Sequence, residues 1–195
     1  MSKFFVIVLT ICCVTLMSFR LTNGDQPTTD NTNNQIHWLT FEEAIKKNQE
    51  APKKVIVDLY TGWCTWCTKM DKATFQHPAI AKYINDNFYA VKLDAEMRNT
   101  VRFKNNDYVY RSGEGKEGVN EIAVFLTRGK LNYPSVVFLD ETMSNPQPIA
   151  GFQSAIRMDK LLKYFGEDNY RHVDWGMFNQ IYKSPLEATF KSNNN

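Results

Sequence analysis

The chain alternates between short apolar runs bounded by turn residues and longer segments in which apolar residues recur at helical spacing. The apolar runs predict strands over residues 54–60, 88–93, 135–139 and about 149–152. Helices are predicted after a capping box at Thr40, from about Cys64 to Lys72, over 78–87, over 119–126, from 158 to 166 closed by Gly166, and over 175–182. Strands that alternate with helices predict an α/β fold.

Two segments depart from this alternation. Residues 101–110 alternate like a small hairpin, and residues 112–118 form a glycine-rich charged loop. We therefore expect an insertion at about 98–118 within a domain that spans residues 35–166. Residues 167–195 would form a C-terminal helical extension and tail, with Trp175, Phe178 and Ile181 on its apolar stripe.

The N-terminus has the pattern of a signal peptide. Lys3 precedes an uncharged apolar run over residues 4–19, and a polar stretch follows it. We predict a signal peptide over residues 1–24, cleaved near Gly24, then a disordered linker over residues 25–34, and so an exported, periplasmic or secreted protein. The alternative is an uncleaved anchor, in which case the protein would meet a membrane only through this leader.

Composition narrows the function classes further. A chain of 195 residues with 43% hydrophobic content can bury one good core. The formal net charge of +2 includes the two leader residues Lys3 and Arg20, so the mature chain would be neutral, and nothing in it favours nucleic-acid binding. Removal of the leader also removes Cys12 and Cys13 and leaves only Cys64 and Cys67.

These two cysteines carry the main chemical prediction. They follow the run Val55-Ile56-Val57-Asp58-Leu59-Tyr60 and a short turn, so Cys64 lies at a helix start, where a thiolate is favoured. Cys67 lies on the same helical face, close enough to close a disulfide. The alternatives are inert core thiols and a zinc half-site, but zinc needs two further ligands, and His37, His77 and His172 are widely dispersed.

The segment Asp58-Leu59-Tyr60-Thr61-Gly62-Trp63-Cys64-Thr65-Trp66-Cys67 resembles the active-site segment of the thioredoxin superfamily. The elements Thr74-Phe75-Gln76-His77-Pro78 and Gly151-Phe152 are similar to motifs in the periplasmic C-terminal domain of the DsbD-type thiol:disulfide interchange protein. A C-x-W-C-x-x-M-D pattern from Cys64 to Asp71 resembles exported bacterial thioredoxin-like proteins. The resemblance covers about residues 35–165 and implies a central mixed sheet flanked by helices, with a hairpin insertion and an extra C-terminal helix.

Two charged residues take roles from this resemblance. Asp58 interrupts an apolar strand, where burial of its carboxyl group raises the pKa. The resemblance implies that Asp58 exchanges a proton with the Cys67 thiol, whereas an ordinary strand aspartate would only find solvent or a hydrogen bond. Lys92 matches a thioredoxin lysine that approaches this acid, and a surface lysine is the alternative.

Three further positions are predicted to bind substrate, and one to support the site. The resemblance implies a cis peptide bond at Tyr133-Pro134, next to a backbone that pairs with an extended substrate. The alternative is a proline at the first position of a strand. Trp66 is expected to be partly exposed to partners, and Trp63 is expected to cover one side of the site.

Together these features predict a thiol–disulfide oxidoreductase that reduces disulfides of exported proteins, with attack by Cys64 and resolution by Cys67. No cofactor is expected. The predicted partners are protein thiols and disulfides and an external electron-donor or acceptor protein, with no nucleic acid. A non-enzymatic binding module or a soft-metal-binding protein that uses the same groove is the alternative, and the direction of electron flow stays open.

Overall fold

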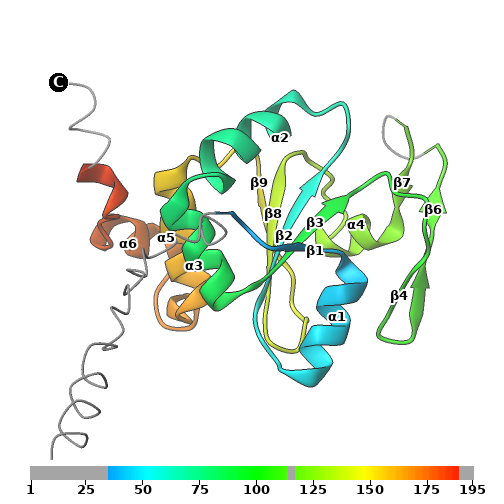
Figure 1. The fold of residues 1–195 in the computed structure, drawn as a ribbon, viewed down its shortest axis with the longest axis horizontal. Helices are drawn as coiled ribbons and strands as arrows, with labels where there is room; N and C mark the ends of the chain where they lie inside the picture. The colour runs from blue at the N-terminus through cyan, green and yellow to red at the C-terminus, as the bar shows by residue number, and fades with distance from the viewer. Residues whose placement is uncertain (1–34, 114–116, 189–195) are drawn as a thin grey trace, which may run out of the picture. The chain divides into compact units, whose positions relative to one another are not determined.

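The computed structural model describes residues 35–113 and 117–188, which form a five-stranded mixed β-sheet with helices on both faces (Figure 1). The strands lie in the order β1, β3, β2, β8 and β9. Strands β1 and β2 run parallel to β3, whereas β8 runs antiparallel to β2 and β9 antiparallel to β8. This arrangement confirms the predicted α/β fold with a mixed central sheet. The predicted signal peptide and linker, and the end of the tail, lie outside the described residues.

The longer strands and the helices follow the predicted order, whereas the short strand β1 was not predicted. The sheet consists of β1 (Trp38–Leu39), β2 (Val55–Tyr60), β3 (Tyr89–Asp94), β8 (Ser135–Leu139) and β9 (Gln147–Ala150). The helices are α1 (Phe41–Glu50), α2 (Thr65–Met70), the π-helical turn η2 (Asp71–Phe75), α3 (Pro78–Asn87), α4 (Glu121–Leu126), α5 (Ala155–Gly166), the 3-10 turn η3 (Asn169–Arg171) and α6 (Trp175–Ile181). Two small pairs stand apart from the sheet: β4 (Val101–Phe103) with β5 (Asn106–Tyr108), and β6 (Tyr110–Arg111) with β7 (Val119–Asn120).

The central strand β2 is buried on both faces, and this places Asp58. Ile56 packs into the core beneath α3 and α5, while Val57 and Leu59 pack into the core beneath α1 and α4. Successive side chains of a strand point to opposite faces, so Asp58 shares the face of Ile56. Met70, the last residue of α2, belongs to the same core, so this end of α2 lies over the Asp58 side of the sheet.

Local sequence signals account for most helix boundaries. At α1 the Thr40 hydroxyl accepts a hydrogen bond from the Glu43 amide (3.2 Å) and the Glu43 carboxylate accepts one from the Thr40 amide (2.8 Å), which confirms the capping box. Pro78 takes the first position of α3, and Ser154 caps α5. These ends are decided by residues close in sequence.

The predicted hairpin forms as β4 and β5, with Lys104 and Asn105 at positive φ in its turn. The second pair, β6 with β7, was not predicted. The helical spacing assigned Val119 to a helix, but this residue belongs to β7. The Asn120 side chain accepts a hydrogen bond from the Ile122 amide, so Asn120 caps α4 and the helix begins after it.

The C-terminal extension packs only in part as predicted. Phe178 of α6 is buried against Tyr164 of α5, with ring centroids 5.1 Å apart. Ile181, expected on the same stripe, is 65% exposed. Trp175, Phe178 and Tyr182 follow the helical repeat, whereas Ile181 lies about 240° around the helix from Trp175. It therefore falls on another face.

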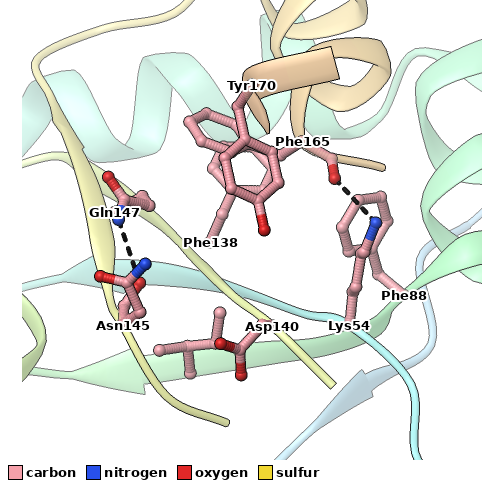
Figure 2. A pocket seen from close by; sticks show the side chains of 9 residues that line it. Lys54, Phe88, Phe138, Asp140, Asn145, Gln147, Phe165 and Tyr170 are labelled. Carbon is pink, nitrogen blue, oxygen red and sulfur yellow. Dashed lines mark hydrogen bonds between the residues drawn. The ribbon is translucent and has the colours of Figure 1, made fainter. Parts of the chain in front are cut away.

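A buried lysine joins this end of the chain to the sheet. Lys54, directly before β2, donates hydrogen bonds to the carbonyl oxygens of Phe165 (3.1 Å) and Gly166 (2.9 Å) at the end of α5. Its ammonium also lies 2.9 Å from the Asp168 carboxylate. Figure 2 shows the aromatic side chains that enclose this corner, among them Phe138 and Tyr170.

Candidate active site

Cys64 and Cys67 are joined by a disulfide at the start of α2, with their Cα atoms 5.3 Å apart. Cys64 caps the helix, and its sulfur accepts a hydrogen bond from the Cys67 amide at 3.0 Å. A donor aimed at a sulfur stabilises the thiolate that forms when the disulfide is reduced. The local order of strand, turn and helix therefore favours Cys64 as the ionised thiol.

Asp58 is 3% exposed and receives little compensation for its burial. Among the described residues its Oδ1 has no hydrogen-bond partner, and Oδ2 lies 3.7 Å from the Lys92 ammonium, too far for a hydrogen bond. Burial raises the pKa of Asp58 to about 7, Lys92 opposes this rise, and the negative charge of Asp71 adds to it. An acid with this pKa can both take and release a proton near neutral pH.

A cleft of about 190 Å³ brings these groups together. Asp58, Cys67 and Lys92 line it, together with Asp71, which carried no predicted role. Cys67, the sulfur on this cleft, is thus the one that a proton acceptor at Asp58 would serve.

Trp63, next to Cys64 in sequence, contacts the Tyr133–Pro134 loop. The Trp63 indole N–H donates a hydrogen bond to Glu96 Oε1 (2.8 Å), and its ring meets Tyr133 edge-on, with centroids 6.0 Å apart. The Tyr133–Pro134 peptide bond is cis. Burial, followed by the charges of Glu96 and Asp94, raises the pKa of Tyr133 to about 12, so its hydroxyl stays neutral.

Trp66 has neighbours of its own. It is 54% exposed, its ring lies 5.8 Å from that of Phe152, and the Lys69 ammonium sits 4.5 Å from its centroid. The side chain is therefore held in place but leaves much of its surface open to solvent.

Residues 21–176 match the family model Thioredox_DsbH, described as a protein of unknown function, DUF255. The chain belongs to this family. The match confirms the predicted resemblance to the thioredoxin superfamily, and the strand order of the sheet agrees with it.

Individual relatives of this DUF255 protein are distant and much longer. It is 28% identical over 151 residues to the uncharacterized protein B0495.5 of Caenorhabditis elegans, covering 68% of this chain and 20% of the relative. It is 25% identical over 130 residues to the thiol:disulfide interchange protein DsbD of Photorhabdus laumondii, and this match covers 66% of this chain and 19% of the relative. A solved structure of a DsbH oxidoreductase has 17% identity and a TM-score of 0.48, covering 67% of this chain and 85% of that one. The chain thus spans about a fifth of these two longer relatives.

Sequence reasoning missed two charged neighbours of the site. Asp71 contacts Lys92, and Glu96 holds the Trp63 indole. Asp71 follows Cys67 by four residues, a spacing that places it on the same helical face and could have drawn attention to it. Glu96 gives no comparable signal, because its contact with Trp63 depends on how β3 ends beside α2.

Residues 35–113 and 117–188 contain no group of three His, Cys, Asp or Glu side chains placed to hold a metal ion. The same residues include no helix of the length and apolar character that crossing a membrane requires.

Proposed function

We propose that this DUF255 protein is a thiol–disulfide oxidoreductase that reduces disulfides of exported proteins. The observation that carries the proposal is the division of roles between the two sulfurs. The Cys64 sulfur accepts the amide hydrogen bond of Cys67, whereas Cys67 lines the cleft that contains the buried Asp58 carboxyl. One sulfur is thus supported as a thiolate, and the other has a proton acceptor beside it.

The proposed reaction begins with the reduced protein. The Cys64 thiolate attacks one sulfur of a substrate disulfide and forms a mixed disulfide, and the released substrate thiolate takes a proton from water. Cys67 then gives its proton to Asp58, and the resulting thiolate attacks the Cys64 sulfur. The second substrate sulfur leaves as a thiol or thiolate, and two electrons have passed from the cysteine pair to the substrate.

Three further residues are proposed to bind the substrate. An extended segment would pair with the backbone at Tyr133, next to Pro134, while Trp66 contacts the residues around its cysteine and Trp63 covers one side of the site. The exposed fraction of 54% supports the role of Trp66, because this side chain ranks among the exposed large apolar side chains of the described residues and lies next to Cys67 in sequence. A separate donor protein would return two electrons to the Cys64–Cys67 disulfide after each cycle.

Trapping of mixed disulfides tests the assigned roles. Cys67→Ser should accumulate mixed disulfides through Cys64, because attack proceeds and resolution does not, and Cys64→Ser is the matched control that should trap none. Mass spectrometry of the non-reduced adducts would show the linked residue. Trapping by Cys64→Ser alone would reverse the roles, and a stable metal-bound form that exchanges no disulfides would favour a binding module instead.

Direction needs a separate measurement. Equilibration of the cysteine pair with glutathione gives its reduction potential, and a value near that of thioredoxin, about −270 mV, is expected for a reductant. A value near about −120 mV would make the protein an oxidant.

A further inference from the structure

The Lys92 ammonium lies between the carboxylates of Asp58 and Asp71 and is closer to that of Asp71. It lies 2.5 Å from Asp71 Oδ1 but 3.7 Å from Asp58 Oδ2. The rings of Trp38 and Tyr60 lie 5.3 and 5.7 Å from the same ammonium and limit where it can move. The lysine that the sequence assigned to Asp58 therefore makes its closer contact with Asp71.

The helix geometry after the disulfide aims Asp71 at this lysine. Helix α2 ends at Met70 and continues as the π-helical turn η2, whose first residue is Asp71. The π-helical turn is held in place by a hydrogen bond of 2.6 Å that the buried Thr74 hydroxyl donates to the Gln153 carbonyl oxygen. A π-helical turn inserted in a helix shifts the side chains that follow it, and such turns recur at functional sites.

We propose that Asp71 is a positioning residue of the redox site: by holding the Lys92 ammonium, it keeps this cation from hydrogen-bonding the Asp58 carboxyl, which is left beside Cys67 as the acceptor of that thiol's proton. The inference rests on the proposed function for its use of Cys67. Asp71 itself exchanges neither protons nor electrons in the reaction. Its 31% exposed side chain keeps one edge toward solvent, so its own charge costs far less than that of Asp58.

The charges that face Asp58 are few and come from known elements. Lys92 from β3 opposes the rise in the pKa of Asp58, and Asp71 from the π-helical turn reinforces it. On its own strand the nearest titratable group is Tyr60, whose pKa is also raised, by burial and then by Asp94. Removing Asp71 would delete one negative charge and also free Lys92 to approach Asp58, and both changes stabilise the Asp58 carboxylate.

The test is a carboxyl-carbon NMR titration of Asp58 in the oxidised full chain. Asp71→Asn should lower the pKa of Asp58 by about one unit. Asp71→Ser, which removes the carboxylate without adding an amide, should lower it similarly. Asp86→Asn, which removes another lysine-paired carboxylate (2.7 Å from Lys82) far from the site in the fold, is the matched control and should leave the pKa unchanged.

A Lys92→Met background separates an effect through the lysine from direct repulsion between the two acids. If Asp71 acts by holding Lys92, most of the shift caused by Asp71→Asn should disappear in this background. A shift of the same size in both backgrounds, or none in either, would overturn the inference. The titration uses no substrate, so the inference about Asp71 can fail while mixed-disulfide trapping through Cys64 succeeds. Trapping can likewise fail while the titration gives the expected shift, and the two outcomes are therefore distinguishable.

A kinetic readout connects the electrostatics to the reaction. The release of substrate from a preformed mixed disulfide on Cys64 should be several-fold slower in Asp71→Asn at pH 7.5, because a less basic Asp58 is a poorer proton acceptor. Asp71→Glu, which keeps the charge, should restore most of the rate. An unchanged rate across pH in Asp71→Asn would also overturn the inference.

Discussion

Lys54, directly before strand β2, and Asp58, in the middle of that strand, are both buried charged side chains, but their charges are compensated to different extents. Lys54 is 8% exposed and has two carbonyl acceptors and a carboxylate within 3.1 Å. Asp58 is 3% exposed and has one ion pair at 3.7 Å. A buried charge with full compensation stabilises one arrangement of the chain, whereas a poorly compensated one remains free to change its protonation state. Within five residues of sequence, the chain therefore buries one well-compensated charge and one poorly compensated charge.

Removal of residues 167–195 should cause the largest loss of stability, because this segment includes residues that pack around Lys54 and α5. It deletes Asp168, and it uncovers the face of α5 against which Tyr170 and Phe178 pack. Loss of these aromatic contacts should cost about 4 kcal/mol or more and lower the melting temperature by about 10 °C. Thermal unfolding followed by circular dichroism would measure it. An unchanged midpoint would mean that the apolar face of α6 serves a partner rather than the fold.

Lys54→Met should cost about 3 kcal/mol, because it leaves the Phe165 and Gly166 carbonyl oxygens and the Asp168 carboxylate without their cation. Disulfide reduction per folded molecule should be unchanged. Urea unfolding measures the first quantity and an activity assay the second. Lys82→Met, which removes an exposed ion pair with Asp86, is the matched control and should cost less than about 0.5 kcal/mol. An equal loss of unfolding free energy in both variants would mean that the buried Lys54 contributes no more to stability than an exposed lysine.

Asp58→Asn should have the opposite pattern to Lys54→Met, because the folded protein should become more stable while disulfide reduction becomes slower. The pKa of Asp58 is about 7 in the folded protein against an ordinary value of 3.8, so the folded state retains a proton that the unfolded chain loses between these values. The contribution of this group to stability therefore falls as pH rises from about 4 to 7. The Asn variant escapes this loss and should be about 4 kcal/mol more stable than the parent at pH 8, but little different near pH 4.

Urea unfolding of parent and Asp58→Asn at the two pH values measures this difference, and reduction rates measured from pH 6 to 9 complete the comparison. Slower reduction is expected most clearly at neutral to mildly alkaline pH, where the Cys67 thiol most needs a base. A less stable variant with full activity would make Asp58 a structural charge like Lys54, and the proposed contrast between these two residues would be wrong.

Most of the fold and part of the site could be predicted because their signals are local. The capping box at Thr40, the apolar run of β2 and the spacing of Cys64 and Cys67 each depend on residues within one turn or one strand. The small β6–β7 pair escaped prediction because two-residue strands have no periodicity, and the π-helical turn after Met70 escaped because helical spacing does not distinguish it from an α-helix.

The sequence by itself determined the order of the longer strands and the helices, the position of the cysteine pair at a helix start and the presence of an acid within a buried strand. Only the tertiary structure decided which charges meet. Lys54 bonds a carbonyl group 111 residues away, and Lys92 is drawn to Asp71, 21 residues before it, rather than to its neighbour across the sheet, Asp58. Such partners are chosen by the packing of distant elements and by competition between charges, and neither leaves a pattern along the chain.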